Sequence, residues 1–424
     1  MRPPDHDRTL DLSIERLAFG GDAIARHDGR VVFVPLAAPG DRVRAAVVER
    51  RRDWLRAELS EVVSPGPDRV APRCPVFGTC GGCQWQQVSP EAQRAAKAAI
   101  VREQLARLGG IRDVDVRPVR AAPDAWGYRA RITLVADGRR LGFHRARSHR
   151  LVEVDDCAIA DPVLSAHLET ARTWASTLRG APTRVTLARA PDGVVLVAAL
   201  PAKPVPPDVS ATERLLAASA AVRGAILVGA GTRIVVGDPG LRVPVEPDLA
   251  LEVPADAFTQ VHAAANLLLV AAVLEASQLG PGSRILDLYC GAGNFALPLA
   301  RRGASVTGIE RSAIAVDAAR ANAARLGLTA RFHCAAVEDM LGRLPPQPVD
   351  LVVLDPPRSG APGVARVLAG RRPPRVVYVS CDPATLARDA RALTATGYRL
   401  AHVQPVDLFP QTYHVETVAQ FVLT

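Results

Sequence analysis

The sequence predicts a multi-domain α/β protein with a small N-terminal β-barrel, a β-rich middle and a doubly wound parallel sheet at the C-terminal end. Three observations favour this organisation. Short apolar runs separated by Gly and Asp turns fill residues 10–63, a cluster of cysteines follows, and from about residue 281 apolar strands alternate with Ala-rich helices. A chain of 424 residues is also too long for one ordinary hydrophobic core.

Positive charge gathers in the N-terminal third. Residues 1–150 hold 27 Arg and Lys against 18 Asp and Glu, whereas residues 151–424 hold 25 of each, so the net charge of +9 comes from the first part. A basic module joined to a neutral one is typical of a protein that holds a polyanion with the first and does chemistry with the second. Codon bias explains the preference for Arg over Lys, but it does not explain this asymmetry.

The sequence shows no sign of secretion or membrane insertion. It contains no run of about 18 apolar residues, and its start, "MRPPDHDRTL", lacks the apolar segment of a signal peptide. We therefore expect a cytoplasmic monomer with no membrane partner. In a reducing compartment the seven cysteines are better explained as metal ligands or catalytic groups than as disulfides.

Residues 8–65 are predicted to form the barrel, because the turn signals "GGD", "HDGR" and "APGD" separate short strand-like runs. Small barrels of this kind commonly bind oligonucleotides. Residues 66–250 form the β-rich central domain, in which "VADGRRL" and "ARAPDGVVL" each place a DG turn between two strands. Helical spacing predicts helices at 90–108 and near 161–179, and the first is a candidate to lie against the C-terminal domain.

A glycine turn in the C-terminal domain, residues 251–424, predicts a cofactor site. In "DLYCGAGNF", Gly291 and Gly293 follow a strand and open a helix, and Asn294 continues the same turn. Glycine there lets the backbone approach a ligand, and Glu310 at the end of the next strand can accept ribose hydroxyls. A dinucleotide also fits this turn, because its fingerprint tolerates Ala296 at the third glycine position.

The segment "LDPPRSG" favours one of these cofactors. Asp355 ends a later strand, and the two prolines after it form a rigid polar lip at the carboxyl ends of the strands, where open α/β sheets bind ligands. A D-P-P lip resembles that of class I S-adenosylmethionine-dependent methyltransferases that act on bases. The sequence therefore favours a methyltransferase over a dehydrogenase.

The cysteine cluster predicts a metal centre. Cys74, Cys80 and Cys83 have the spacing C-x5-C-x2-C with glycines between them, and Cys157 in "VEVDDC" is the best fourth ligand. Four thiolates suit zinc or a [4Fe-4S] cluster, and the spacing leaves both open. Four protein ligands would leave no open position, which argues for a structural role.

Cys381 and Glu416 are the candidates for catalysis. A free cysteine is most often a small buried residue, and a glutamate within a strand-like run is as often a solvated edge residue. Beside a methyl donor, however, the pair has a specific use. A thiolate that adds to C6 of uracil makes C5 nucleophilic enough to take a methyl group, and a base then removes the C5 proton.

These motifs are similar, nearly end to end, to those of the RNA uracil-5-methyltransferases that carry an N-terminal TRAM domain and an iron-sulfur cluster. The resemblance is carried by "DGRVVFVPLAAPGD", "CPVFGTCGGCQWQ", "LGFHRARSHRLVEVDDC", "DLYCGAGNF", "LDPPRSG", "VSCDP" and "HVET". It implies an OB-like TRAM barrel at 8–65, an iron-sulfur central domain at 66–250 and a Rossmann-like class I methyltransferase domain at 251–424.

The resemblance also implies residue roles. Cys381 would be the nucleophile, Glu416 the proton acceptor and Asp355 a residue that borders the site. The residues implied for the methyl donor are Gln260, Tyr289, Glu310 and Asp355. The ligands implied for a [4Fe-4S] cluster are Cys74, Cys80, Cys83 and Cys157.

Three positions depart from the family pattern. Tyr289 stands where phenylalanine is common, which keeps an aromatic face. Ala335 stands at a position that is often polar, which removes one contact expected near the adenine. His262 replaces the asparagine usual after "FxQV", so the loop there is expected to differ.

The predicted activity is transfer of a methyl group from S-adenosylmethionine to C5 of a uridine in structured RNA through a Cys–C6 adduct. Within the resemblance, 23S rRNA is the favoured substrate and tRNA the alternative. RNA cytosine-5 methylation is an alternative reaction with the same thiolate chemistry. A non-catalytic iron-sulfur RNA-binding protein is the alternative from another class, and the intact pair of Cys381 and Glu416 argues against it.

Overall fold

The structure, a computed structural model, describes residues 9–280, 282–344 and 347–424. The chain divides into two compact units. The first contains the described residues up to 100 together with 144–152 and 409–414, and the second contains the rest. The domain boundaries predicted at 65 and 250 stay predictions.

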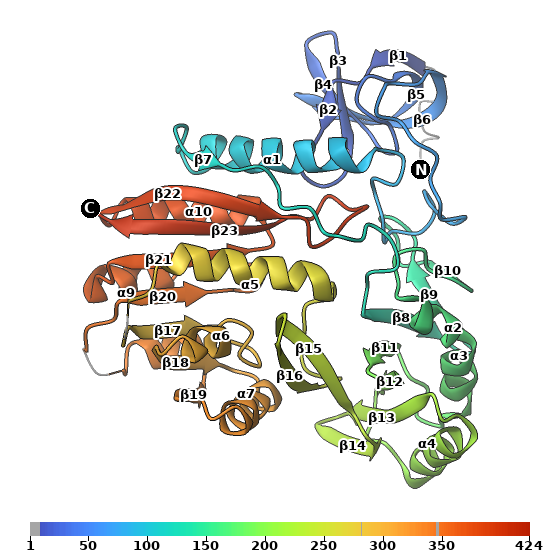
Figure 1. The fold of residues 1–424 in the computed structure, drawn as a ribbon. Helices are drawn as coiled ribbons and strands as arrows, with labels where there is room; N and C mark the ends of the chain where they lie inside the picture. The colour runs from blue at the N-terminus through green and yellow to red at the C-terminus, as the bar shows by residue number, and fades with distance from the viewer. Residues whose placement is uncertain (1–8, 281, 345–346) are drawn as a thin grey trace. The chain divides into compact units, whose positions relative to one another are not determined.

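The first unit contains a six-stranded sheet in the order β1-β5-β6-β4-β3-β2, which is strongly curled (Figure 1). Its strands are β1 (Thr9–Ser13), β2 (Arg16–Leu17), β3 (Ala23–His27), β4 (Arg30–Val34), β5 (Arg42–Arg50) and β6 (Trp54–Ser64). Between β3 and β4, Asp28 and Gly29 both have positive φ, at 48° and 74°. This is the backbone that an Asp-Gly hairpin favours, so the predicted "HDGR" turn is confirmed.

Trp85 is the largest fully buried side chain of the first unit's core. Its indole Nε1 donates to the carbonyl of Gly21 at 3.0 Å. The main-chain amides of Gln84 and Trp85 donate to the carbonyl of Gln411 at 3.1 and 3.0 Å. Gln411 also exchanges two side-chain hydrogen bonds with Gln93. The segment 409–414, late in the sequence, is therefore an integral part of the first unit.

The central part of the second unit is a sheet in which β9, β8, β11, β12, β13 and β14 follow one another. The strands of this region are β8 (Arg131–Asp137), β9 (Arg140–His144), β11 (Arg184–Ala190), β12 (Gly193–Ala199), β13 (Val222–Gly229) and β14 (Thr232–Gly237). The short strand β10 (Leu151–Glu153) begins in the first unit. The two predicted DG hairpins, β8–β9 and β11–β12, are confirmed. Its helices are α2 (Pro162–Ala166), α3 (Leu168–Thr177) and α4 (Pro206–Ala218), so the single helix predicted near 161–179 is two.

The C-terminal part of the second unit is built on a sheet of order β19-β18-β17-β20-β21-β23-β22-β7. The strands are β7 (Asp115–Val116), β17 (Arg284–Leu288), β18 (Ser305–Glu310), β19 (Ala330–Cys334), β20 (Leu351–Leu354), β21 (Arg375–Ser380), β22 (Tyr398–Val406) and β23 (Glu416–Leu423). β17 to β21 are parallel, whereas β23 runs antiparallel to β21. The hairpin β15 (Gly240–Glu246) and β16 (Leu249–Pro254) precedes this sheet.

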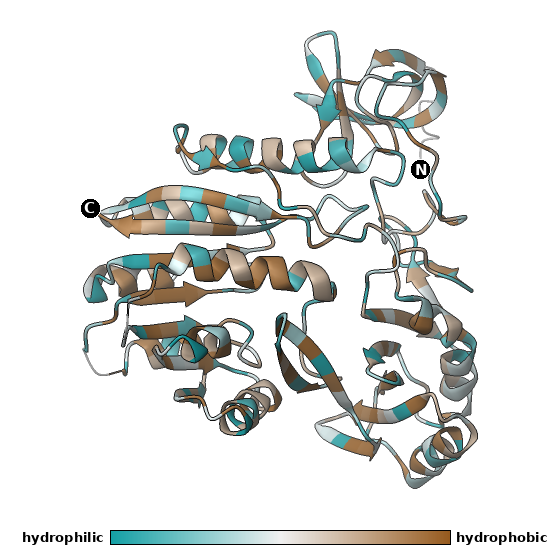
Figure 2. Cartoon of the chain, in the orientation of Figure 1, coloured by the Kyte–Doolittle hydropathy of each residue, from teal (hydrophilic) through white to brown (hydrophobic). Residues whose placement is uncertain are grey.

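Helices cover both faces of this sheet, because its parallel strands are apolar on both sides (Figure 2). Ile285, Val353 and Val377 belong to one buried cluster, while their neighbours Leu286 and Val352 belong to another. The first cluster includes residues of α5 (Ala263–Ser277), α6 (Ala296–Arg301) and α7 (Ala313–Arg325). The second includes residues of α8 (Val337–Leu341), α9 (Val364–Arg371), α10 (Pro383–Thr394) and the second half of α1 (Pro90–Arg107). The predicted doubly wound sheet is confirmed.

Within the described residues, no helix is both long and apolar enough to span a membrane.

Candidate active site

Strand register brings the predicted donor residues to one edge of the C-terminal sheet. Leu288 of β17 is paired with Ile309 of β18 and with Leu354 of β20. The next residue on each strand therefore lies at the same edge, where the carboxyl ends of parallel strands form the ligand site of open α/β sheets. Those three residues are Tyr289, Glu310 and Asp355.

Cys381 and Glu416 lie opposite one another at this edge. Ser380, the last residue of β21, is paired with Thr417 of the antiparallel strand β23, so the next pair in register is Cys381 and Glu416. Thr417 Oγ1 donates to the Ser380 carbonyl at 3.0 Å, which closes the ladder. Directly opposed residues have Cβ atoms about 5 Å apart. Glu416 is only 2 % exposed, so the solvated edge-strand alternative is wrong.

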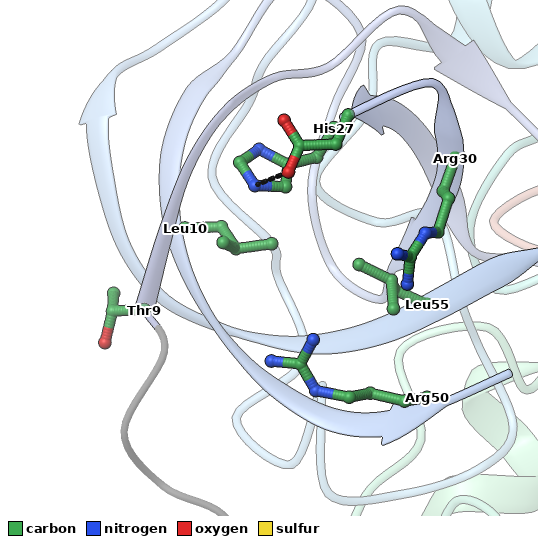
Figure 3. Close-up of a pocket in the computed structure, with 7 residues that line it drawn as sticks. Thr9, Leu10, His27, Arg30, Arg50 and Leu55 are labelled. Atoms are coloured by element: carbon green, nitrogen blue, oxygen red, sulfur yellow. Dashed lines mark ion pairs between the residues drawn. The ribbon is translucent and has the colours of Figure 1, made fainter.

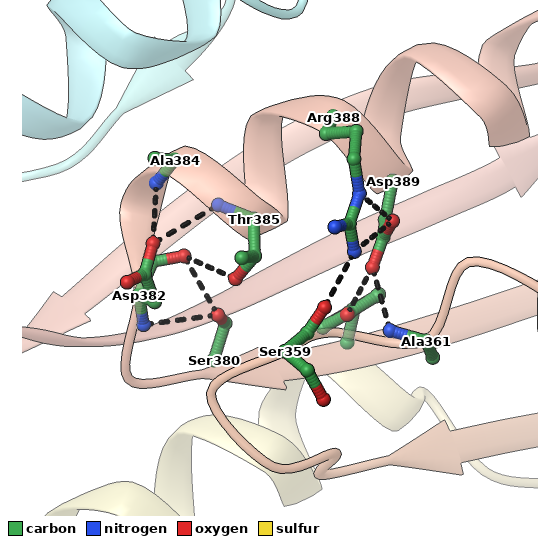
Figure 4. Close-up of polar contacts among 9 residues, drawn as sticks. Ser359, Ala361, Ser380, Asp382, Ala384, Thr385, Arg388 and Asp389 are labelled. Atoms are coloured by element: carbon green, nitrogen blue, oxygen red, sulfur yellow. Dashed lines mark hydrogen bonds and ion pairs between the residues drawn. The ribbon is translucent and has the colours of Figure 1, made fainter.

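The Asp-Pro dipeptide after Cys381 ends the strand and begins a helix. Asp382 caps α10: its Oδ1 accepts from the amides of Ala384 and Thr385 at 2.9 and 3.0 Å (Figure 4). Pro383 takes the first helical position, where its missing N–H is no loss. Cys381 is thus held between a strand and a capped helix, at the ligand edge.

The glycine turn is bound to the predicted ribose acceptor. Gly291 and Gly293 have φ values of 54° and 95°, and a Cβ at Gly293 would lie 2.9 Å from the Leu297 side chain. The Glu310 carboxylate accepts from the amide of Gly291 at 3.3 Å and from that of Ser312 at 2.7 Å. Its position beside the turn is therefore defined by the backbone.

Tyr289 and Asn294 flank this turn. Tyr289 adopts a left-handed φ of 62°, which costs a non-glycine residue about 1–2 kcal/mol, and its hydroxyl donates to Glu338 at 2.7 Å. The amide of Asn294 exchanges hydrogen bonds of 2.9 and 3.1 Å with that of Asn266 on α5. These bonds tie the turn to α5, and the donor-binding role of Asn294 stays a prediction.

Gln260 lies on the loop between β16 and α5, and the start of β8 fixes that loop. The amide of Ala130 donates to the Val261 carbonyl at 2.8 Å, and Arg131 donates to the Ala257 carbonyl at 2.6 Å. Gln260 itself is half-buried. The central sheet therefore supports the loop that carries this predicted donor residue.

His262 keeps the loop in place although asparagine was expected there. Its Nδ1 accepts from the amide of Ala265 at 3.4 Å, which caps α5. Its Nε2 therefore carries the proton and donates to the Asp124 carbonyl at 3.0 Å. The ring stacks on Tyr128 with centroids 4.6 Å apart. Burial lowers the pKa of His262, so the residue is a neutral capping group.

Four carboxylates converge on the ligand edge: Asp287, Glu310, Asp355 and Glu416. Sequence reasoning missed Asp287, which is fully buried. Neither of its carboxylate oxygens has a partner within strict hydrogen-bond geometry among the described residues, although the backbone amide of Ala296 is close enough to act on it. Burial raises the pKa of Asp287 well above its ordinary value, the charges of Asp355 and Glu310 raise it further, and the Ala296 amide lowers it.

The same crowding acts on the catalytic pair. Burial raises the pKa of Asp355 to about 7. Burial and the charge of Asp355 raise the pKa of Glu416 well above its usual range, while Arg358 opposes this shift. Burial, followed by the charges of Glu416 and Asp355, raises the pKa of Cys381 to about 12. The thiol is therefore protonated at neutral pH when the site is empty.

This charge distribution selects the class of ligand. Several carboxylates held close together in a partly buried site repel one another, which is costly without a counter-charge. A cation would relieve the repulsion at this edge, whereas a pyrophosphate would add to it. S-adenosylmethionine carries a sulfonium and an ammonium, and a dinucleotide carries phosphates. The geometry thus supports the methyltransferase prediction over the dehydrogenase.

Comparison with known families agrees with this assignment. Residues 6–60 match the TRAM domain, residues 285–356 match a methyltransferase domain, and residues 343–422 match the family described as tRNA (Uracil-5-)-methyltransferase. A 23S rRNA (uracil(1939)-C(5))-methyltransferase RlmD of Alkalilimnicola ehrlichii is 39% identical, over 97% of this chain and 96% of that protein. The chain belongs to the RNA uracil-5-methyltransferase family.

Other relatives span the same length. RlmD of Azoarcus sp. is 37% identical over 96% of this chain and 98% of its own. An uncharacterised RNA methyltransferase of Thermosynechococcus vestitus is 36% identical over 97% of both chains. The fold is similar to that of a Pyrococcus abyssi tRNA (uracil-54, C5)-methyltransferase solved with S-adenosyl-L-homocysteine, with a TM-score of 0.72, 24% identity and coverage of 98% of this chain and all of that one.

The predicted metal ligands of this uracil-5-methyltransferase are divided between the two units. Cys74, Cys80 and Cys83 lie on turns of the first unit, and Cys157 lies in the second. The amide of Gly82 donates to Cys80 Sγ at 3.4 Å, and hydrogen bonds of this kind are found around cluster sulfurs. No group of three or more Cys, His, Asp or Glu in the described ranges has the arrangement of a metal site. The donor chemistry fits a cluster, and the cluster stays a prediction.

A basic hollow on the N-terminal barrel is the candidate RNA contact. Several arginines in the barrel or just after it pair with a carboxylate; the pairs are Arg26–Glu15, Arg44–Glu61, Arg51–Glu49, Arg56–Asp22 and Arg69–Asp41. Arg30 and Arg50 form no ion pair with a described residue. Both line a hollow of about 300 Å³ together with Thr9, Leu10, His27, Asp28 and Leu55, and Figure 3 shows the two guanidinium groups on either side of Leu55.

Phe258 is a second residue that sequence reasoning missed. It is 71% exposed and lies two residues before Gln260, on the loop fixed by β8. A phenylalanine in a loop gives no sequence signal of exposure. The sequence does not single out Asp287 either, because an acidic residue before a glycine turn looks like an ordinary residue near the end of a strand.

Donor binding is expected to depend on pH through Asp355. Because burial raises the pKa of this carboxyl to about 7, it is mostly protonated at pH 6 and mostly ionised at pH 8, and only the ionised form attracts a sulfonium. The ratio of affinities for S-adenosylmethionine over S-adenosylhomocysteine, whose sulfur carries no charge, should rise about tenfold between these pH values, measured by calorimetry.

Asp355→Asn should flatten this rise. Asp350→Asn is the matched control, because Asp350 precedes the same strand at its opposite end and accepts from the Arg284 amide at 2.7 Å. A wild-type ratio that stays constant from pH 6 to pH 8 would contradict the role of Asp355.

Proposed function

We propose that this chain methylates C5 of a uridine in 23S rRNA with S-adenosylmethionine as donor. The observation that carries the proposal is the strand register Ser380–Thr417, which puts Cys381 and Glu416 next to one another at the edge where Asp287 and Glu416 are buried. The RNA assignment rests on the relatives named RlmD, which match over nearly the whole chain. A tRNA substrate is the second candidate, because the family matched by residues 343–422 is described by that substrate.

The proposed reaction begins with Cys381. Its sulfur bonds to C6 of the uracil, the electrons of the C5–C6 double bond move to C5 and O4, and a neighbouring carboxylate takes the thiol proton. C5 then attacks the methyl group as the bond from that carbon to the sulfonium breaks, and S-adenosylhomocysteine leaves. Glu416 removes the C5 proton, the double bond reforms and the thiolate departs.

Raised pKa values suit Asp355 and Glu416 to this task. A carboxylate with an ordinary pKa near 4 is a weak base at neutral pH, whereas one raised toward neutrality accepts a proton more readily. Two protons must move, one from the thiol and one from C5, and two such carboxylates face the thiol. The donor's sulfonium supplies the positive charge that allows both to ionise at once.

The RNA target must leave its stack to reach Cys381. The exposed ring of Phe258 offers a face on which a displaced base can stack. Arg30 and Arg50 are proposed to contact phosphates, since unpaired arginines release counterions when they bind a nucleic acid. Mapping 5-methyluridine over total RNA from cells with and without the gene tests the substrate, and an unchanged 23S rRNA refutes it.

Variants of the catalytic pair should fail at different steps. Cys381→Ala should lower turnover more than about 10³-fold, because no adduct forms. Glu416→Gln should form and methylate the adduct but not resolve it, leaving RNA-bound protein that migrates slowly on a denaturing gel. Glu275→Gln is the control, because Glu275 is an exposed carboxylate on α5. This variant should neither lose turnover nor accumulate RNA-bound protein. Substantial turnover by Cys381→Ala, or no trapped species with Glu416→Gln, would refute the respective assignment.

The barrel hollow should contribute sequence-independent affinity. Replacing Arg30 and Arg50 by Ala should make the slope of log affinity against log salt shallower by about two for a transcribed 23S rRNA fragment. The double variant Arg26→Ala, Arg44→Ala is the control, because carboxylates already neutralise both side chains. Equal slopes for both double variants would refute the phosphate role of the hollow.

We propose that Cys74, Cys80, Cys83 and Cys157 hold a [4Fe-4S] cluster with a structural role, and no step of the reaction passes through it. Protein purified without oxygen should contain about four iron and four sulfide per chain. Cys80→Ser should lower both, whereas Cys334→Ser, an exposed thiol on β19, should not. A colourless protein with zinc would support the zinc alternative. The monomeric state and cytoplasmic location stay predictions.

A further inference from the structure

The loop after β20 carries two charged residues of the site, and its residue Ala361 is hydrogen-bonded to α10. This lip, defined as residues 355–361, contains Asp355 and Arg358. Asp355 raises and Arg358 lowers the pKa of both Cys381 and Glu416. A small movement of the lip would therefore change the charge around the nucleophile and around the base together.

One buried carboxylate on α10 holds the end of the lip. Asp389 is 3 % exposed, and its Oδ2 accepts from the amide of Ala361 at 2.7 Å and from the hydroxyl of Tyr378 at 2.7 Å. Its Oδ1 accepts from Arg388 Nε at 2.8 Å. Figure 4 shows Ala361 and Arg388 on either side of the carboxylate of Asp389. A single side chain thus connects the lip, β21 and α10.

The backbone of the lip passes close to the Asp389 carboxylate. Arg388 Nη2 donates to the Ser359 carbonyl at 2.7 Å. Gly360 has a φ of 75°, and a Cβ there would lie 2.5 Å from Asp389 Oδ2 and closer still to the Arg388 guanidinium. Only glycine allows this approach, so the chain turns directly over the carboxylate.

The N-terminal end of the same helix directly follows the nucleophile. Asp382, the cap of α10, follows Cys381 directly and lies seven residues before Asp389. Seven residues are about two helical turns, so both carboxylates are on the same side of α10 and about 10 Å apart along its axis. The helix is a rigid connection between the thiol and the lip.

We propose that Asp389 is a positioning residue for methyl transfer, which fixes the lip, and with it Asp355 and Arg358, relative to Cys381. The proposal rests on the proposed function, because it assigns the residue to that reaction. Catalytic groups misplaced by about 1 Å can lose on the order of 10²-fold in rate, and the lip has no buried strand of its own to hold it.

Asp389→Asn tests the proposal, because an amide has one acceptor oxygen and cannot accept from both Ala361 and Arg388, each of which contacts the lip or belongs to it. The matched control is Asp208→Asn. Asp208 is also fully buried and accepts from two backbone amides, of Gly180 at 3.1 Å and Val205 at 3.0 Å, but it belongs to α4 beside the central sheet. Both substitutions weaken hydrogen bonds to a buried carboxylate, but only Asp389 contacts the lip.

Two readouts are taken on the full chain. Hydrogen exchange of a peptide covering 355–363 measures the lip without substrate, and steady-state kinetics on transcribed 23S rRNA measures the reaction. Asp389→Asn should speed lip exchange and lower kcat at least about tenfold, with the KM for RNA within about twofold. Asp208→Asn should change neither, once rates are corrected for the folded fraction measured by thermal unfolding.

The possible outcomes distinguish a failure of the positioning role of Asp389 from a failure of the proposed function. If Asp389→Asn leaves kcat or lip exchange at the wild-type value, the positioning role is wrong. Equal corrected losses of kcat in both variants would also overturn it, because they would show a role in stability alone. If wild-type protein makes no 5-methyluridine in any RNA, the proposed function fails, and lip exchange still shows whether Asp389 holds the loop.

Discussion

The reversed direction of β23 is the constraint on which the site depends. In a wholly parallel sheet every strand ends at the ligand edge, so only residues at strand carboxyl ends reach it. Because β23 runs antiparallel to β21, its first residue, Glu416, lies at that edge beside Cys381. The proposed reaction needs a nucleophile and a base on the same uracil ring, and the neighbouring strands β21 and β23 place one of each beside it. Backbone hydrogen bonds of the ladder, rather than mobile loops, define their separation.

The same register crowds carboxylates together, and their repulsion has a structural consequence. Because the pKa of Asp355 is raised to about 7, the native state binds this proton more tightly than the unfolded chain does. The corresponding contribution to stability is present at acidic pH and is lost as the pH rises from the ordinary carboxyl range through about 7. The site therefore stores unfavourable charge at neutral pH, and a cationic donor relieves it on binding. Recognition of a cationic donor and the raised pKa of the buried Asp287 both follow from this crowding of carboxylates.

Much of this could be predicted from sequence, because strand and turn signals are local. The alternation of apolar strands and Ala-rich helices indicates a doubly wound sheet, and a cysteine after one strand and an acid after another indicate a shared edge. Local sequence signals could not predict that Cys381 lies opposite Glu416, since this depends on the register between β21 and β23. Asp389 was invisible for a similar reason: within "TLARDA" it resembles a solvated helical residue. Its partners, Tyr378 and Ala361, are distant in sequence.

The raised pKa of Cys381 gives the empty site a further property. A half-buried thiol with a pKa of about 12 is almost wholly protonated at neutral pH, and the thiolate is the reactive form toward oxidants and electrophiles. Part of that rise comes from burial, which no ligand reverses, and part from the charges of Glu416 and Asp355. A sulfonium beside those carboxylates offsets the second part only. Attack on C6 must therefore coincide with proton transfer to a carboxylate, so the thiol becomes nucleophilic only when donor and uracil are both in place.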